Sequence, residues 1–109
     1  MTKGEKQLTA LSRLKKKAEH VFDLEIASHT VPVYNSPDLV KSAGCWGVAI
    51  LHPDYCIILD TACPKHQWRR TLLHEFLEVV NDIYHLNLNE QKIRVLEQSI
   101  WQLNRQKRI

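Results

Sequence analysis

The chain has few cysteines, and it lacks any long apolar run. Its 109 residues contain three cysteines, Cys45, Cys56 and Cys63, with no Cys-x-x-Cys spacing. An odd number without that spacing argues against a disulfide framework and against a cysteine-based zinc site. We therefore interpret all three as small buried residues. No apolar run approaches the ~20 residues that a membrane-spanning helix needs, so we expect no contact with a membrane.

Signals for targeting and for nucleic-acid binding are also weak. Residues 1–6 lead into an amphipathic stretch without a signal-peptide core, so we expect a cytoplasmic protein. The net charge of +3 does not by itself imply a polyanionic partner. Basic residues cluster at 15–17 and 105–108, but they do not alternate with the aromatic residues that single-strand binding uses. A nucleic-acid partner is therefore not expected, although a small nucleic-acid-associated protein stays an alternative.

The composition is that of a globular protein, and the chain length suits one domain over residues 1–109. Residues 4–22 have a helical spacing of apolar residues, with lysines and arginine mostly on the other side. Residues 31–34 predict a short extended segment, in which Pro32 points to an edge or a strand start. Residues 46–51 and 56–60 are apolar runs separated by turn-forming residues and predict a β-hairpin.

Two further helices are expected after the hairpin. Pro64 is acceptable in the first turn of a central helix. Asn89 is a suitable N-cap for a last helix over roughly residues 90–106. The order of helix, extended segment, hairpin, helix and helix predicts an α+β fold with a small antiparallel sheet packed against helices.

Residues 71–82 combine an apolar helical pattern with ionisable groups at regular spacing. At roughly 100° per residue, the apolar side chains fill an arc of about 160°. His74, Glu78, Asn81 and His85 form a stripe about 60° wide on the opposite side. His74, Glu75 and Glu78 make a His-Glu-x-x-Glu pattern, one residue away from the His-Glu-x-x-His signature of zinc hydrolases. The stripe fits a metal-lined cleft, and it also fits the solvent side of an ordinary amphipathic helix.

Residues 71–75, with a strand ending at residue 60 before them and the segment 89–93 after them, resemble small zincin-type metallopeptidases of the ImmA/IrrE class. Many of these resemble short phage and mobile-element proteins. The resemblance covers roughly residues 31–104. It implies a zincin-like fold, one catalytic zinc and hydrolysis of peptide bonds. In several members the hydrolysed protein is a repressor of the same mobile element.

By position, the resemblance makes His74 the first metal ligand and Glu75 the general base. Glu78 stands where the family has its second histidine. A carboxylate oxygen binds zinc at about the same distance as an imidazole nitrogen, so the substitution is compatible with a metal site. One histidine and two carboxylates also suit other divalent ions, so the identity of the metal stays open.

For the third metal ligand we select Glu97, because it lies on the next helix at the edge of its apolar face. Glu90 and His85 are the alternatives. With a metal bound, Glu75 would take the proton of a water molecule that attacks a substrate carbonyl. The negative charge of Glu78 would reduce the Lewis acidity of the metal, so slow turnover or none is expected.

Three functions remain open on this evidence. The first is a zinc-dependent peptidase of narrow specificity, for which a regulatory protein of a phage or mobile element is a candidate substrate. The second is a catalytically inactive zincin-like module that binds or regulates a protein, and the third is the nucleic-acid-associated phage protein. For the peptidase, we expect the strand at residues 56–60 to present an edge that holds a substrate peptide in extended form.

Overall fold

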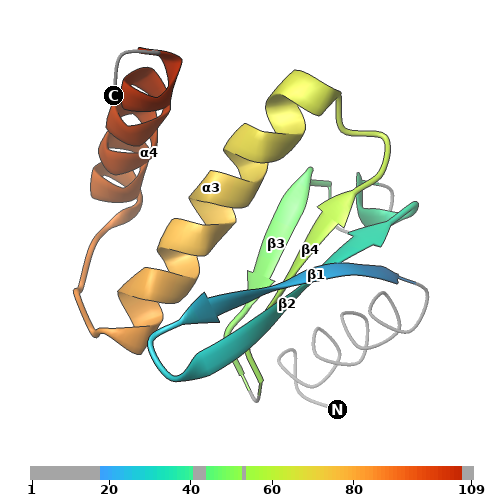
Figure 1. Ribbon diagram of the computed structural model, residues 1–109, viewed down its shortest axis with the longest axis horizontal. Helices are drawn as coiled ribbons and strands as arrows, with labels where there is room; N and C mark the ends of the chain where they lie inside the picture. The colour runs from blue at the N-terminus through green and yellow to red at the C-terminus, as the bar shows by residue number, and fades with distance from the viewer. Residues whose placement is uncertain (1–17, 41–43, 53, 107–109) are drawn as a thin grey trace.

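The computed structural model describes residues 18–40, 44–52 and 54–106, which form an α+β arrangement as the sequence predicts (Figure 1). Helix α3 covers one face of a sheet, and α4 packs on the side of α3 that faces away from the sheet (Figure 1). The elements are, in chain order, β1 (Glu19–Ile26), β2 (His29–Ser36), β3 (Gly47–Ile50), β4 (Cys56–Asp60), α3 (Lys65–Ile83) and α4 (Glu90–Arg105).

The sheet is mixed, so the prediction of an antiparallel sheet was wrong in one pairing. Its strand order is β1-β2-β4-β3. The predicted hairpin is confirmed, since β3 and β4 are antiparallel, and β1 and β2 form a second antiparallel pair. Strand β2 is parallel to β4, with Val33 opposite Ile57. Every residue of β4 is buried, which requires a neighbouring strand on each side. The local sequence pattern does not reveal that β2 is the second of these neighbours.

The predicted N-terminal helix is wrong at its C-terminal end. Residues 19–22 open β1, and residues 4–17 lie outside the described residues. Along β1, Phe22, Leu24 and Ile26 are buried or half-buried, and the residues between them are exposed. This alternation has the period of a strand that covers a core with one face. The strand period therefore determines the structure at Phe22, which the helical spacing of residues 4–22 had assigned to a helix.

Pro32 lies in β2, which is an inner strand, but this part of β2 pairs with β1 only. Pro32 is opposite Asp23 of β1, whereas pairing with β4 begins only at Val33. Proline cannot donate a backbone hydrogen bond, so it is tolerated where a strand has a neighbour on one side only. The prediction of an edge position therefore holds locally, although β2 as a whole is not an edge strand.

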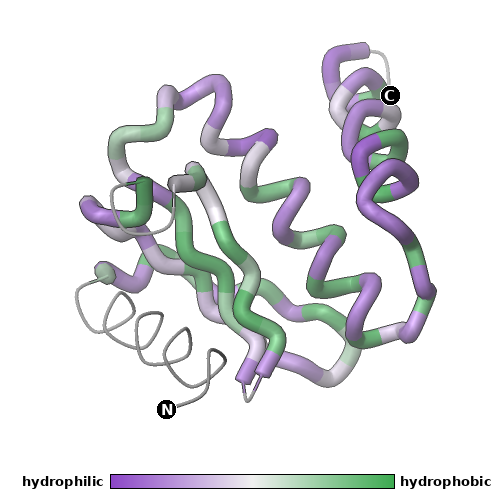
Figure 2. Tube along the Cα trace, turned by 180° about the vertical axis from the view of Figure 1, so that it is seen from behind, coloured by the Kyte–Doolittle hydropathy of each residue, from purple (hydrophilic) through white to green (hydrophobic). Residues whose placement is uncertain are grey.

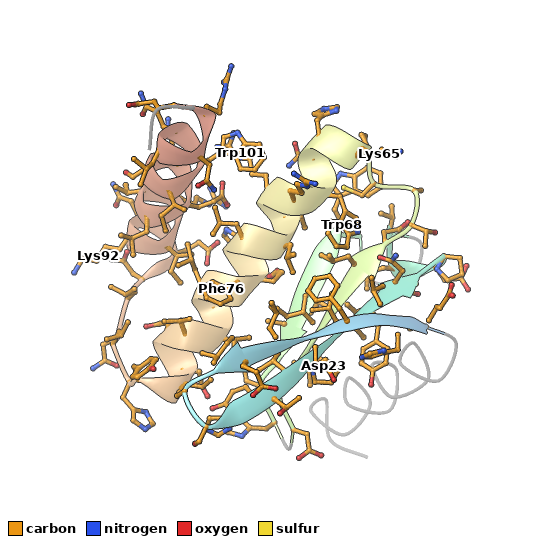
Figure 3. All side chains as sticks on the ribbon, in the orientation of Figure 1. Asp23, Lys65, Trp68, Phe76, Lys92 and Trp101 are labelled. Carbon is orange, nitrogen blue, oxygen red and sulfur yellow. The ribbon has the colours of Figure 1, made fainter. Side chains whose placement is uncertain are left out.

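The core has two parts, one on each face of the sheet. Ile57 and Leu59 of β4 pack with Val79 of α3 on one face. Ile58 and Cys56 point to the opposite face and pack with Leu39. Figure 2 shows hydrophobic residues gathered on the strands and at intervals along α3. The aromatic ring of Trp68 extends from α3 toward the sheet (Figure 3) and packs against the first part of the core.

The beginning of the last helix is confirmed. Asn89 is its N-cap, and its Oδ1 accepts a hydrogen bond of 2.9 Å from the backbone N–H of Lys92. The helical spacing of this segment predicts an apolar face of Ile93, Leu96, Ile100 and Leu103. Ile93 is buried, but Leu96 and Leu103 are exposed, because α3 is the main element that α4 contacts. Within the described ranges, neither helix combines the length and apolar character needed to cross a membrane.

Candidate metal centre

The candidate centre lies between α3 and α4 and is built around His74. His74 is in the middle of α3, and Glu78 follows one turn later on the same face. The cap at Asn89 makes Glu90 the first residue of α4. Glu97 is seven residues further along, which is about two helical turns, so Glu90 and Glu97 share the face that meets α3.

Carboxylates surround both nitrogens of the His74 ring. Nε2 lies 3.1 Å from Glu90 Oε1 and 3.6 Å from Glu78 Oε1. Nδ1 lies 2.8 Å from Glu97 Oε1. Without a cation, a ring that carries a proton on each nitrogen satisfies the contacts on both sides. The Nε2 side, which has two carboxylates, is the side on which a divalent cation could replace a proton.

Glu97 is itself held by Arg70. Arg70 Nε donates a hydrogen bond of 2.9 Å to Glu97 Oε2, while Oε1 faces His74. The side chain of Glu97 is only 13% exposed, so the pair is shielded from solvent on the glutamate side. A histidine that binds a metal usually donates its other N–H to a carboxylate, which sets the tautomer and the orientation of the ring. The structure places Glu97 in that supporting position.

One donor atom from each of His74, Glu78 and Glu90 lies within 4.8 Å of the others, close enough for the three to hold one metal ion. A nitrogen and two carboxylate oxygens fit zinc as well as harder ions such as manganese. Burial and a hydrogen bond with Glu90 raise the pKa of Glu78, and the negative charge of Glu90 adds to the increase. The two carboxylates therefore repel each other in the absence of a cation, and a divalent cation between them would relieve that repulsion.

Glu75 is buried beside this cluster, with a side chain only 8% exposed. Burial raises its pKa to about 7; the charge of His74 opposes the increase, and the charges of Glu78, Glu90 and Glu97 add to it. Within the described residues, no hydrogen bond to its carboxylate is found. A carboxyl group with a pKa near neutrality can both take up and release a proton, as a general base must.

Glu75 lines a cleft of about 280 Å³, together with His74, Arg70, Glu97, Trp46 and Gly47. Gly47 begins β3, an edge strand of the described sheet, and brings that strand against α3. A Cβ atom at this position would lie 2.6 Å from Thr71 Cγ2 and 3.3 Å from Glu75 Cγ. The absence of a side chain at Gly47 therefore lets the edge strand form one wall of the cleft.

The cysteines do not contribute a nucleophile to this cleft. Cys56 and Cys63 are buried, as predicted, and Cys45 is half-buried. Burial raises the pKa of the Cys45 thiol, and the charge of Glu75 raises it further. The reactive form of a cysteine is its thiolate, so these surroundings keep Cys45 unreactive.

The structure brings together most of the site residues predicted from the sequence. His74, Glu75, Glu78 and Glu97 all belong to the centre. Glu90, predicted as an alternative ligand, faces Nε2 of His74 beside Glu78, whereas Glu97 contacts the other ring nitrogen.

His85 lies outside the centre. It follows α3 with a φ of 52° and lines a separate hollow with Asn81 and Asn87. The expected edge at residues 56–60 was wrong, since β4 lies between β2 and β3. Strand β3 is the edge beside the cleft.

Sequence reasoning missed Arg70 as the partner of Glu97, and it missed the contact of Gly47 with α3. The contact of Arg70 with Glu97 had a signal in the sequence, because Arg70 and His74 are four residues apart on one helix and both face Glu97. No comparable signal exists for Gly47, since the packing of β3 against α3 depends on the fold.

No model of a known protein family matches the chain, and neither a curated protein nor a solved structure gives a significant match.

Proposed function

We propose that the protein is a zincin-like, metal-dependent peptidase of narrow specificity that acts on a protein or peptide substrate, such as a regulatory protein of a phage or mobile element. The observation that carries this proposal is the position of Glu75. It is a buried carboxylate with a pKa raised to about 7, in a cleft that it shares with His74. Such a pairing of a general base with metal-binding groups is what hydrolysis of a peptide bond needs.

The ligands for the metal would be His74 through Nε2, Glu78 and Glu90. A divalent cation bound there would supply a Lewis acid that polarises a peptide carbonyl and makes a water molecule more acidic. Glu97 would hold the ring of His74 through Nδ1, and Arg70 would hold Glu97. Glu75 would accept the proton of the attacking water and pass it to the leaving amine.

The edge strand β3 offers a place for the substrate backbone. Its open edge lies beside the cleft, and an extended peptide can add to such an edge through main-chain hydrogen bonds. The order of a β3–β4 hairpin, then α3 with the His-Glu pair, then α4 with acidic residues also agrees with what the resemblance to the ImmA/IrrE class implies. Zinc is the ion which that class implies, and manganese fits the carboxylate-rich ligand set.

The proposal is tested by metal content and cleavage together. Mass spectrometry of the purified, tag-free protein should find one equivalent of zinc or manganese, which His74→Ala loses and Glu75→Gln retains. A peptide library derived from a bacterial proteome should be cut by the metal-loaded protein and left intact by Glu75→Gln. Equal cleavage by both proteins would remove the proposed role of Glu75, and absence of metal after incubation with either ion would remove the metal site.

A catalytically inactive binding module is the second candidate, and the ion-pair network around His74 favours it. His74, Arg70 and Glu97 satisfy one another without a cation, so the network stabilises the contact of α3 with α4 even in a metal-free protein. For such a module, His74→Ala would loosen α4, no library peptide would be cut, and a protein partner would be recovered by pull-down with the wild-type chain.

A further inference from the structure

Three adjoining hollows meet at Trp101, outside the candidate metal centre. Their volumes are about 380, 650 and 540 Å³, and Trp101 lines all three. Figure 3 shows the indole of Trp101 extending from α4 toward the N-terminal half of α3. The residues that give these hollows their character are Lys65, Arg69, Arg70, Trp101 and Arg105, and we call this surface the Trp101 groove.

The Trp101 groove is positively charged. Lys65 and Arg69 come from the first turns of α3, and Arg105 comes from the last turn of α4. Within the described residues, none of these three forms an ion pair, and no acidic residue lines the hollows. Exposed like charges from two helices that face one another repel, so their gathering at one groove is not explained by the stability of the fold.

The groove adjoins the cleft of the candidate centre at Arg70. Arg70 lines both the cleft that contains Glu75 and the hollow that contains Arg105. The two sides of Arg70 have opposite charge, because Glu75 and Glu97 line the cleft on one side and the groove on the other side is cationic. A ligand that lies along the whole surface therefore has a negative segment at the groove end.

We propose that the Trp101 groove binds an acidic peptide segment, with carboxylates on Arg69 and Arg105 and the peptide chain against the Trp101 indole. The guanidinium groups of Arg69 and Arg105 match carboxylates in shape and charge. The indole offers a rigid apolar surface that costs little conformational entropy on binding. That this segment belongs to the peptide cut at the adjoining cleft rests on the proposed function.

An acidic peptide fits this surface better than a nucleic acid does. A nucleic-acid strand carries a charge at every nucleotide, and beyond the groove it would meet Glu97, Glu90 and Glu78. A peptide confines its acidic residues to a few neighbouring positions. The glutamates of the centre therefore disfavour the strand and leave the peptide unaffected.

The experiment measures binding of fluorescein-labelled hexaglutamate to the full-length protein by fluorescence anisotropy, with EDTA present and about 50 mM salt. Hexaglutamine of the same length is the uncharged control, and a labelled hexamer of thymidylate is the nucleic-acid control. Arg69→Glu and Arg105→Glu should each weaken hexaglutamate binding about tenfold, by removing an attraction and adding a repulsion. Lys92→Glu makes the same charge change at an exposed position of α4 outside the groove, and it should change binding less than twofold.

Two further outcomes decide the proposal. Equal loss of affinity in Arg69→Glu and Lys92→Glu would overturn it, because binding would then follow net charge rather than the groove. Tighter binding of the thymidylate hexamer, lost in Arg69→Glu, would also overturn it and assign the groove to single-stranded nucleic acid. Because EDTA removes any metal, hexaglutamate binding does not depend on the candidate centre. The metal content of the same preparation, measured before EDTA is added, distinguishes a failure of the groove from a failure of the peptidase proposal.

Discussion

Glu97 Oε1 lies 2.8 Å from Nδ1 of His74, on the side of the ring that faces away from Glu78 and Glu90. This contact makes Glu97 a residue that orients His74, whereas the sequence suggested that it binds the metal itself. The two roles predict different losses of affinity. A missing metal ligand abolishes a three-ligand site, but a missing supporting carboxylate weakens metal affinity about 10- to 100-fold.

Glu97→Gln should therefore retain a measurable but weaker site for zinc or manganese. The amide oxygen of glutamine can still accept the Nδ1–H of His74, but without the negative charge that strengthens the contact. Competition with a coloured chelator measures the affinity, and Glu19→Gln, an exposed change on β1, is the control. Complete loss of stoichiometric metal in Glu97→Gln would return Glu97 to the ligand set.

Glu78→His should raise the affinity for zinc about tenfold or more and increase the preference for zinc over manganese. The change supplies a second imidazole nitrogen, which zinc binds well, and it removes the repulsion between Glu78 and Glu90. Glu78→Gln removes the same charge without supplying a strong ligand, so it should weaken both metals. If Glu78→His and Glu78→Gln behaved alike, position 78 would not be a ligand position.

Glu75 should make the metal-free protein less stable as the pH rises. Its pKa is about 7 in the folded chain against an ordinary 4.5, so the folded state holds a proton that the unfolded state releases between these values. The stability from this group is fully present below about pH 4.5 and is lost as the pH rises through 7, with a total of about 3 kcal/mol. Urea unfolding of the wild type and of Glu75→Gln, in EDTA, at pH 4.5, 6 and 8 measures it. The glutamine variant mimics the protonated form, so the stability difference between the two proteins should widen with pH; a constant difference would contradict this account.

Gly47→Ala should destabilise the fold by about 1 to 3 kcal/mol, since its Cβ would overlap Thr71 Cγ2 and Leu59 Cδ2. Thr71→Ser removes the first of these atoms and keeps the hydroxyl that donates to the Gln67 carbonyl. Adding Thr71→Ser to Gly47→Ala should therefore recover part of the loss. Thermal unfolding of the two single variants and the double variant gives the coupling, and strictly additive effects would show that Gly47 does not contact α3 as described.

The sequence predicted those features that depend on neighbouring residues. The β3–β4 hairpin follows from two apolar runs around a turn, and the start of α4 follows from the capping side chain of Asn89. The meeting of His74 with Glu78 follows from helical spacing alone. In each case the residues that interact are within one element or in adjacent elements.

The features that the sequence did not predict depend on contacts between distant elements. The parallel pairing of β2 with β4 joins Val33 to Ile57, and no local pattern distinguishes it from an antiparallel pairing. The choice between Glu90 and Glu97 at the Nε2 side depends on how α4 is placed along α3, because both glutamates share one face of the helix. The Trp101 groove likewise combines residues of two helices, so no single stretch of the sequence contains it.

The packing of α4 on α3 has a thermodynamic consequence for the candidate centre. Glu90 and Glu97 belong to α4, and His74 belongs to α3, so a cation held between the helices binds the docked arrangement and not an arrangement in which α4 has moved away. By mass action, a cation at 100 times its dissociation constant would stabilise the docked helix by about 2.7 kcal/mol. Backbone amides in α4 should then exchange with deuterium about a hundred times more slowly when the metal is present, while amides in β4 change less. Amide exchange in α4 would therefore show whether a cation occupies the centre.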